Sequence, residues 1–411
     1  MKHLKTVFNA LLGLLLLVFS GALTPVRAQD TAVEAVQATP MTVEATQADP
    51  MDSVEISLLT CQPHDEVYSL YGHTAIRLRD MRAGKQIDAV FNYGVFNFKA
   101  PHFVARFVFG LTDYELGAYP FDLFQREYRH FGSMVTEQVL NLASEEKTAL
   151  RDALGENLRP ENAVYRYNYF YNNCTTKARD IIEQCISGKI EYAEREDFAP
   201  SYRDMVHEMT RNNPWSRFGN DLLLGIKADQ TTNRSQQEFL PNNLMYDFDH
   251  AQIYENGQYR PLVKERRVAL PGGVRMVNAG FPLSPMTCSI VLTAIGLLIF
   301  LIEWKKRTVF VAWELLLMVT AGCIGIVLFL MLFSQHPTVS LNLQIVLFNP
   351  LHWFFLWPVL RGKQTRYWTI TTVLVILFLV GGLFQHFAEG IHSLALCLLM
   401  QSVLHLKRVR Q

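Results

Sequence analysis

Long uncharged runs fill the last third of the chain, whereas shorter apolar patterns, separated by charged and turn-forming residues, fill the middle. Each long run can cross a hydrocarbon core of about 30 Å. The runs are Met286–Trp304, Thr308–Phe333, Asn342–Leu360, Tyr367–Phe384 and Ile391–Leu406. The pattern therefore predicts a linker over residues 271–285 and a membrane domain with five transmembrane helices over residues 286–411. The third run contains Asn349 and Pro350 and is the weakest span.

Charged residues between these runs predict the orientation of the membrane domain. Basic segments follow the first, third and fifth runs, at Lys305–Arg307, Arg361–Arg366 and Lys407–Arg410. The loops around His336 and Glu389 carry no such cluster. Because basic loops tend to stay in the cytoplasm, we expect the part of the chain before the membrane domain to lie on the outer side.

The amino terminus indicates export independently. Lys2 and Lys5 precede a short apolar core over Leu11–Phe19, and the small residue Ala28 follows. This order predicts a secretory signal peptide over residues 1–28. An uncleaved membrane anchor is the alternative, although the apolar core is short for a span. Residues 29–52 are polar and show no periodicity, which predicts a flexible leader.

The middle of the chain reads as one folded α+β domain over residues 53–270. Apolar and polar residues alternate in two stretches, at residues 68–79 and 86–92, as in the strands of a hairpin. With the turn centred between residues 82 and 83, antiparallel pairing sets His73 opposite Asn92. The same register sets Arg77 opposite Asp88 and gathers the apolar residues on the other face of the hairpin.

A helix is predicted to begin at Cys174. Asn173 can cap it by accepting the free backbone N–H groups of the first turn, and Gly188 is a natural stop. Apolar residues then recur at helical spacing, at Ala178, Ile181, Ile182 and Cys185. A cysteine in the first turn lies where the helix dipole favours its thiolate.

Cys174, His73 and Asn92 together have the composition of a thiol catalyst. The thiolate would attack, the imidazole would move protons, and the amide would orient the ring. Each residue alone also has a structural interpretation: a free or disulfide-bonded cysteine, a packed histidine and a turn asparagine. Cys185 is too far along the helix to bond to Cys174, but it could pair with Cys61 in an oxidising compartment.

Aromatic residues are dense between Phe96 and Phe131. They are expected to form core, or alternatively an apolar channel for acyl chains. The channel candidates are Phe103, Phe107, Phe109 and Phe121. His336, Asn342 and Asn349, in or after the first outer loop, are candidates for contact from the membrane side, or are solvated loop residues.

Composition excludes several other classes of function. The chain of 411 residues has a net charge of zero, so no electrostatic case for nucleic acid exists. The sequence contains no metal-ligand cluster and no Gly-rich phosphate loop, so neither a metal nor another cofactor is expected.

Two motifs carry a resemblance to known families. Tyr71-Gly72-His73-Thr74 and Asn173-Cys174-Thr175-Thr176 resemble the permuted papain-like (NlpC/LRAT-like) proteins, in which the histidine strand precedes the cysteine helix. With Phe91-Asn92-Tyr93-Gly94, Ser334-Gln335-His336-Pro337-Thr338 and the five-span tail, the chain is similar to the Lnb-type lipoprotein N-acyltransferases of Gram-negative bacteria. The implied fold is a permuted papain-like periplasmic domain followed by an all-α multi-span membrane domain.

This resemblance implies an enzyme of the inner membrane that moves a fatty acyl chain through a thioester intermediate. The donor would be a phospholipid and the acceptor the α-amine of a diacylglyceryl-cysteine lipoprotein. Cys174, His73 and Asn92 are then the candidate catalytic residues. The candidate substrate-binding residues are Tyr71, Asn173, Phe103, Phe107, His336, Asn342 and Asn349. A papain-like cell-wall peptidase or amidase and a non-catalytic membrane sensor are the alternatives.

Overall fold

The computed structural model describes residues 51–82, 86–97, 100–196, 198–275, 280–361 and 366–409. The predicted signal peptide and all but the end of the predicted leader lie outside these residues. The described residues fall into two compact units. The sheet unit comprises residues 51–200 and 231–275, and the helical unit comprises residues 201–230 and 280–409, with the gaps stated above.

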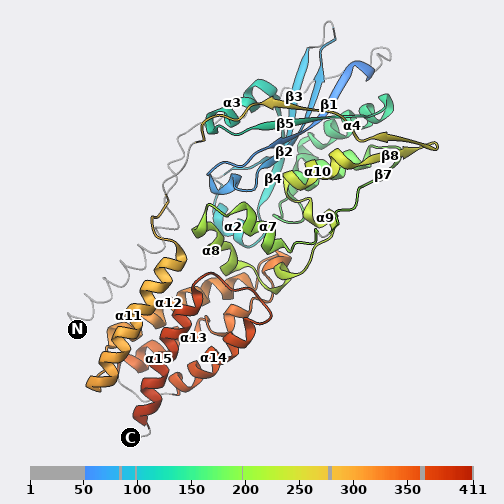
Figure 1. Ribbon diagram of the computed structural model, residues 1–411. Helices are drawn as coiled ribbons and strands as arrows, with labels where there is room; N and C mark the ends of the chain where they lie inside the picture. Colours follow the sequence, from blue (N-terminus) through green and yellow to red (C-terminus); the bar gives the residue numbers. More distant parts are fainter. Residues whose placement is uncertain are drawn as a thin grey trace. The chain divides into compact units, whose positions relative to one another are not determined.

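A seven-stranded antiparallel sheet forms the centre of the sheet unit, in the order β10-β5-β1-β2-β3-β4-β6 (Figure 1). Its strands are β1 Val54–Cys61, β2 His73–Asp80, β3 Ile87–Val95, β4 Asp113–Pro120, β5 Val135–Leu140, β6 Val164–Arg166 and β10 Val263–Leu270. A second sheet consists of β7 Lys189–Glu191, β8 Gln252–Glu255 and β9 Gln258–Pro261.

Helices cover both faces of the large sheet. The longer ones are α2 Phe103–Val108, α3 Phe121–Phe131, α4 Ser144–Asn157, α6 Cys174–Gln184 and α10 Pro241–His250, with one-turn α5 Pro160–Ala163 and α9 Arg234–Gln237. Ile56 and Ile76 pack with α4, α6 and α10. Leu59 and Ala75 point the opposite way and pack with α3. The alternation along β1 and β2 therefore places apolar residues in two cores, one on each side of the sheet.

The predicted hairpin of β2 and β3 is present, but its register differs from the expected one by two residues. Arg77 is paired with Val90, and Arg79 with Asp88. A shift of two residues keeps every side chain on its face, so Arg77 still reaches Asp88 diagonally, with its Nη2 2.7 Å from the carboxylate.

The helical unit contains five apolar helices, one within each predicted run. They are α11 Pro285–Lys306, α12 Val311–Met331, α13 Leu351–Leu360, α14 Tyr367–Gly381 and α15 Ile391–Val409. Three stretches are long and apolar enough to cross a membrane: Pro285–Lys306, Val311–Met331 and Leu343–Leu360; α14 and α15 are apolar but shorter. The third stretch is broken at Asn349 and Pro350, between the 3₁₀ turn η5 (Leu343–Val346) and α13.

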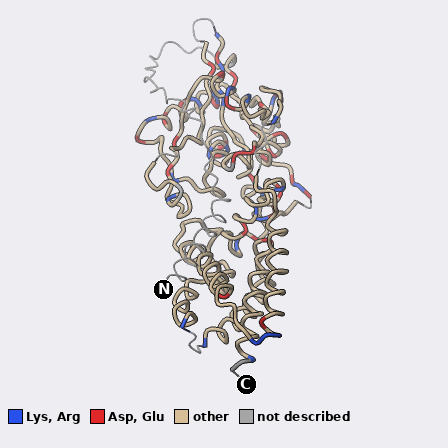
Figure 2. The backbone as a smooth tube through the Cα atoms, turned by 90° about the vertical axis from the view of Figure 1, so that its left-hand side faces the viewer, with Lys and Arg blue, Asp and Glu red and all other residues tan. Residues whose placement is uncertain are grey.

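Positions occupied by Lys, Arg, Asp or Glu are few along these helices, and several gather at the end of the bundle near the carboxyl terminus (Figure 2). Lys305 and Lys306 lie in the last turn of α11. At the same end, the Lys407 ammonium lies 3.4 Å from the ring centre of Trp304, and the Arg361 guanidinium lies 4.3 Å from that of Trp357. Basic and aromatic residues of this kind anchor helices at a membrane surface.

The helical unit also includes a segment that the sequence assigns to the preceding domain. Residues 201–230 form α7 Tyr202–Met209, α8 Pro214–Leu223 and the 3₁₀ turn η3 Ile226–Asp229. The carbonyl groups at the end of α8 accept hydrogen bonds from side-chain amides of the loops between the apolar helices. Asn342 bonds to the carbonyl of Leu222 at 2.8 Å, and Gln344 to that of Asp221 at 3.0 Å. These bonds satisfy acceptors that the helix cannot satisfy itself.

Candidate active site

The predicted cap holds Cys174 at the first position of α6. The side-chain oxygen of Asn173 accepts the backbone N–H groups of Thr175 and Thr176 at 2.9 and 3.0 Å. The Asn173 amide also donates to the carbonyls of Tyr169 and Phe239, so both ends of its side chain form hydrogen bonds to the backbone. These contacts give Asn173 a positioning role, because they fix where the helix, and with it the thiol, begins.

His73 and Asn92 meet as side chains despite the changed register. Nε2 of His73 lies 2.8 Å from Oδ1 of Asn92. The same oxygen accepts the backbone N–H of Gly94 at 2.7 Å, and the Asn92 amide donates to the hydroxyl of Tyr119. These partners fix the orientation of the amide, so Nε2–H of His73 donates and Nδ1 is left for the thiol.

The thiol of Cys174 is hydrogen-bonded to the ring of His73. One bond between strand and helix supports this pairing. The hydroxyls of Thr74 and Thr175, each next in sequence to one of the two residues, lie 3.1 Å apart. Both threonines are fully buried, whereas His73 and Cys174 are only half-buried. The two buried threonines therefore hold His73 and Cys174 in place, while both of these residues remain partly exposed to solvent.

Burial acts to raise the pKa of the Cys174 thiol, but its partners more than offset this effect. The positive charge and hydrogen bond of His73, the backbone N–H of Thr74 and the hydroxyl of Thr175 lower its pKa to about 7. Burial acts to lower the pKa of His73, but the Cys174 thiolate raises it overall, with help from Glu127 and Asn92. Each charge stabilises the other, which favours a thiolate–imidazolium pair near neutral pH.

Gly94 leaves room for the imidazole. A Cβ atom at this position would lie 2.6 Å from Cε1 of His73 and 3.0 Å from Oδ1 of Asn92. No side chain fits there unless the ring moves. The glycine therefore permits the backbone of β3 to approach the ring closely enough for Asn92 to reach it.

An aromatic cluster next to Cys174 contains two of the predicted substrate-binding residues. Phe103 stacks on Phe96 at 5.5 Å between ring centres, and Phe107 lies 6.1 Å from Tyr167. Tyr114 and Tyr167 stack at 4.0 Å. After burial, which is the larger cause, the Cys174 charge also raises the pKa of Tyr114. These rings come from α2, β4 and two loops. The sequence did not single out Tyr114 or Tyr167 as site residues, because no local pattern connects them to Cys174.

Two other predicted residues of the sheet unit have distinct surroundings. Tyr71 is half-buried, and its ring meets that of Tyr169 edge to face at 4.9 Å. Phe121, a candidate for channel lining, is instead buried in the core as the first residue of α3, and the Arg77 guanidinium lies 3.4 Å from its ring centre.

The remaining predicted residues have their contacts inside the helical unit. Asn342 is buried and, besides its bond to Leu222, accepts a bond from the Gln385 amide at 3.0 Å. Asn349 bonds to backbone groups around the break before α13. His336 is buried at the start of the 3₁₀ turn η4 Pro337–Val339. Asn342 and Asn349 thus shape the loops between the apolar helices.

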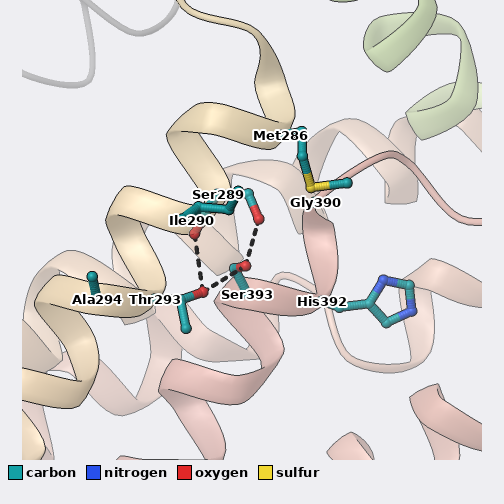
Figure 3. A pocket seen from close by; sticks show the side chains of 8 residues that line it. All are labelled: Met286, Ser289, Ile290, Thr293, Ala294, Gly390, His392 and Ser393. Atoms are coloured by element: carbon teal, nitrogen blue, oxygen red, sulfur yellow. Dashed lines mark hydrogen bonds between the residues drawn. The ribbon is translucent and has the colours of Figure 1, made fainter.

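A pocket of about 470 Å³ lies between α11 and α15 in the helical unit. Figure 3 shows the hydroxyls of Ser289, Thr293 and Ser393 pointing toward one another across the two helices. They are mutually hydrogen-bonded, at 2.5 Å for Ser289 and Ser393 and 2.8 Å for Thr293 and Ser393. The hydroxyls therefore join the two helices in a setting that is otherwise apolar.

All six cysteines are free thiols. The pairing of Cys61 with Cys185 that the sequence left open is not formed: Cys61 is buried beneath α3, and Cys185 packs against the core on the other face. Within the described ranges, no group of three or more His, Cys, Asp or Glu side chains is placed to hold a metal ion.

Two family models match the chain. Residues 42–232 match the Lnb N-terminal periplasmic domain, and residues 277–411 match the Lnb transmembrane domain. No curated protein and no solved structure matches the chain. Together with the apolar helices, the two matches describe a multi-pass membrane protein that carries a periplasmic domain.

Proposed function

Since the chain belongs to the Lnb family, we propose that it is a membrane-bound cysteine acyltransferase of the bacterial inner membrane. It would move a fatty acyl chain from a phospholipid to the α-amine of a diacylglyceryl-cysteine lipoprotein. One observation carries the proposal: Cys174 begins a helix and bonds to His73, whose other ring nitrogen is held by Asn92. A histidine strand before a cysteine helix supports the permuted papain-like interpretation.

The first half of the reaction transfers the acyl chain to the enzyme. The Cys174 thiolate attacks the ester carbonyl of the phospholipid, and the carbon–sulfur bond forms as the ester carbon–oxygen bond breaks. His73, as imidazolium, protonates the leaving oxygen of the lysophospholipid. The aromatic cluster around Phe103 and Phe107 would hold the acyl chain, since apolar side chains remove it from water.

The second half transfers the chain to the acceptor. The neutral amine attacks the thioester carbonyl, His73 takes one of the two protons from the nitrogen, and the thiolate of Cys174 leaves. The product is an amide, and the thiolate–imidazolium pair is restored. Asn92 supports both steps by keeping the Nδ1 face of the ring toward the sulfur.

Mass spectrometry of lipoprotein amino termini tests this proposal. Cells that lack the protein would be complemented with the wild type or with Cys174→Ala, at matched protein levels. We expect the N-linked acyl chain only with the wild type. Full acylation with Cys174→Ala would contradict the covalent mechanism. Unchanged lipoproteins with altered cell-wall fragments would favour the peptidase alternative, and a phenotype that Cys174→Ser restores fully would favour the sensor.

A further inference from the structure

Glu127 lies on the helix that flanks the Cys174–His73 pair. It falls between the buried residues Phe124 and Tyr128 of α3. The ring of Phe124 lies 6.3 Å from that of Tyr119, whose hydroxyl accepts the bond from Asn92. Tyr128 bonds to Cys61, which is paired directly with His73 across β1 and β2. Both neighbours of Glu127 therefore contact the strands that hold the catalytic groups.

A group of aromatic side chains, one of them exposed to solvent, begins one helical turn after Glu127. Phe131, one turn later on the helix, stacks on His64 at 3.9 Å between ring centres. His64 meets the exposed ring of Tyr68 at 5.6 Å. The negative charge of Glu127 raises the pKa values of both His73 and Tyr68, although burial is the larger influence at each. The carboxylate is therefore close enough to both His73 and Tyr68 for its charge to act on each of them.

Desolvation by the surrounding protein raises the pKa of Glu127, and the positive charge of His73 offsets only part of this effect. Within the ranges that the structure describes, Glu127 has no ion-pair or hydrogen-bond partner, whereas Asp122 on the same helix pairs with Arg126 at 3.3 Å. The Glu127 side chain is exposed to solvent. A carboxylate close to a thiolate works against that thiolate by charge repulsion, and an unpaired one at the approach to the site suits a cationic ligand.

We propose that Glu127 binds the primary ammonium group of the lipoprotein acceptor and positions it beside His73. This inference rests on the proposed function and names the group that recognises its second substrate. An α-ammonium has an ordinary pKa of about 8 and must lose one proton before it can attack a thioester. Glu127 holds the ammonium and passes that first proton to solvent. The neutral amine then attacks, and His73 takes the second proton.

Kinetics of the full-length protein in phospholipid vesicles test the inference. The donor would be phosphatidylglycerol, which has no ammonium group, and the acceptor a synthetic diacylated lipopeptide with a free amine. For Glu127→Gln we expect the acceptor KM to rise about 10- to 100-fold, because a charge-assisted hydrogen bond is lost. The rate of Cys174 thioester formation in the absence of acceptor should change much less than the acceptor KM, because Glu127 acts on the Cys174–His73 pair only through its charge. The donor KM should be unchanged.

Two further variants separate binding from structural effects. Glu127→Asp should retain much of the acceptor affinity, and Asp122→Asn, which removes a charge elsewhere on α3, should behave like the wild type. An unchanged acceptor KM in Glu127→Gln would overturn the inference. So would an effect seen only with phosphatidylethanolamine as donor, since the bound ammonium would then belong to the donor. If the wild type itself formed no thioester and no amide, the proposed function would fail, and the inference with it.

Discussion

The thiol of Cys174 gains its reactivity from neighbours that act in opposition to its burial. Because the pKa of Cys174 is lowered to about 7, the thiolate forms above that pH and is lost below it. We expect alkylation by iodoacetamide to rise with pH to half its maximum near pH 7. His73→Gln removes the positive charge and leaves the burial, so the midpoint should move above the ordinary thiol value of about 8.5.

At pH 7 that change should slow alkylation about tenfold or more, because a smaller fraction of the thiol is ionised. Peptide mass spectrometry would follow Cys174 separately from the other cysteines, with Cys174→Ala as the background. An unmoved midpoint in His73→Gln would show that the imidazole does not control the thiol.

Gly94 gives a second prediction at the scale of one residue. Gly94→Ala should abolish most acyl transfer, because the new methyl group would displace the His73 ring or the Asn92 amide. Gly155→Ala on α4 is the matched control, since nothing lies within 4 Å of its Cβ position. The control should keep its activity and gain about 1 kcal/mol of stability, because alanine is the better helix former. Activity and thermal unfolding of both variants would be measured in detergent.

At the scale of elements, the bond between Thr74 and Thr175 joins β2 to α6. Thr74→Val and Thr175→Val should each destabilise the protein by about 1–3 kcal/mol, since each leaves a buried hydroxyl without that partner. The double variant should cost less than the sum of the two, because both hydroxyls are then absent. Unfolding measurements on all four proteins would give the coupling. Strict additivity would mean that the bond does not hold the two elements together.

Features encoded locally were predictable from the sequence. The cap at Asn173 and the spacing of Ala178 and Ile181 define α6, and the structure confirms them. Alternation in β2 and β3 was also sufficient to put His73 and Asn92 on one face. It did not determine the register, because a shift of two residues preserves both faces and the turn alone decides between the two pairings.

Features that depend on long-range packing were not predictable. Tyr114 and Tyr167 lie far apart in sequence and meet only when β4 packs beside the loop that follows β6. For the same reason, the sequence could not show that residues 201–230 belong to the helical unit. Their helices look like ordinary globular sequence, and the amides that bind them come from loops more than a hundred residues later.

At the scale of the whole molecule, Arg203 holds residues 201–230 together. Its guanidinium is almost fully buried and lies 2.7 Å from Asp221 and 2.6 Å from Asp229. Arg203→Met should destabilise the helical unit by about 3–5 kcal/mol, because it leaves two carboxylates without their buried partner. Thermal unfolding in detergent would measure this change.

Arg217 offers the control for that experiment. It pairs with Glu389 at 2.9 Å, but both side chains are more than a quarter exposed. Arg217→Met should therefore cost about 1 kcal/mol or less. Equal losses in the two variants would show that burial of the Arg203 cluster does not set its contribution.

The hydrogen bonds that hold residues 201–230 also determine when this segment can finish folding during synthesis. Asn342 is 120 positions after Leu222, and Gln385 is 161 positions after Leu224, yet each pair shares a bond. At about 5–20 residues per second, the ribosome reaches these partners roughly 6–30 s after it has made the segment. Until these partners have been synthesised, the carbonyl groups of the segment lack the side-chain amides that bond to them in the folded protein. Its folding is completed by the last helices to enter the membrane, so a chain cut short after α12 would carry this segment without the amides that fix it.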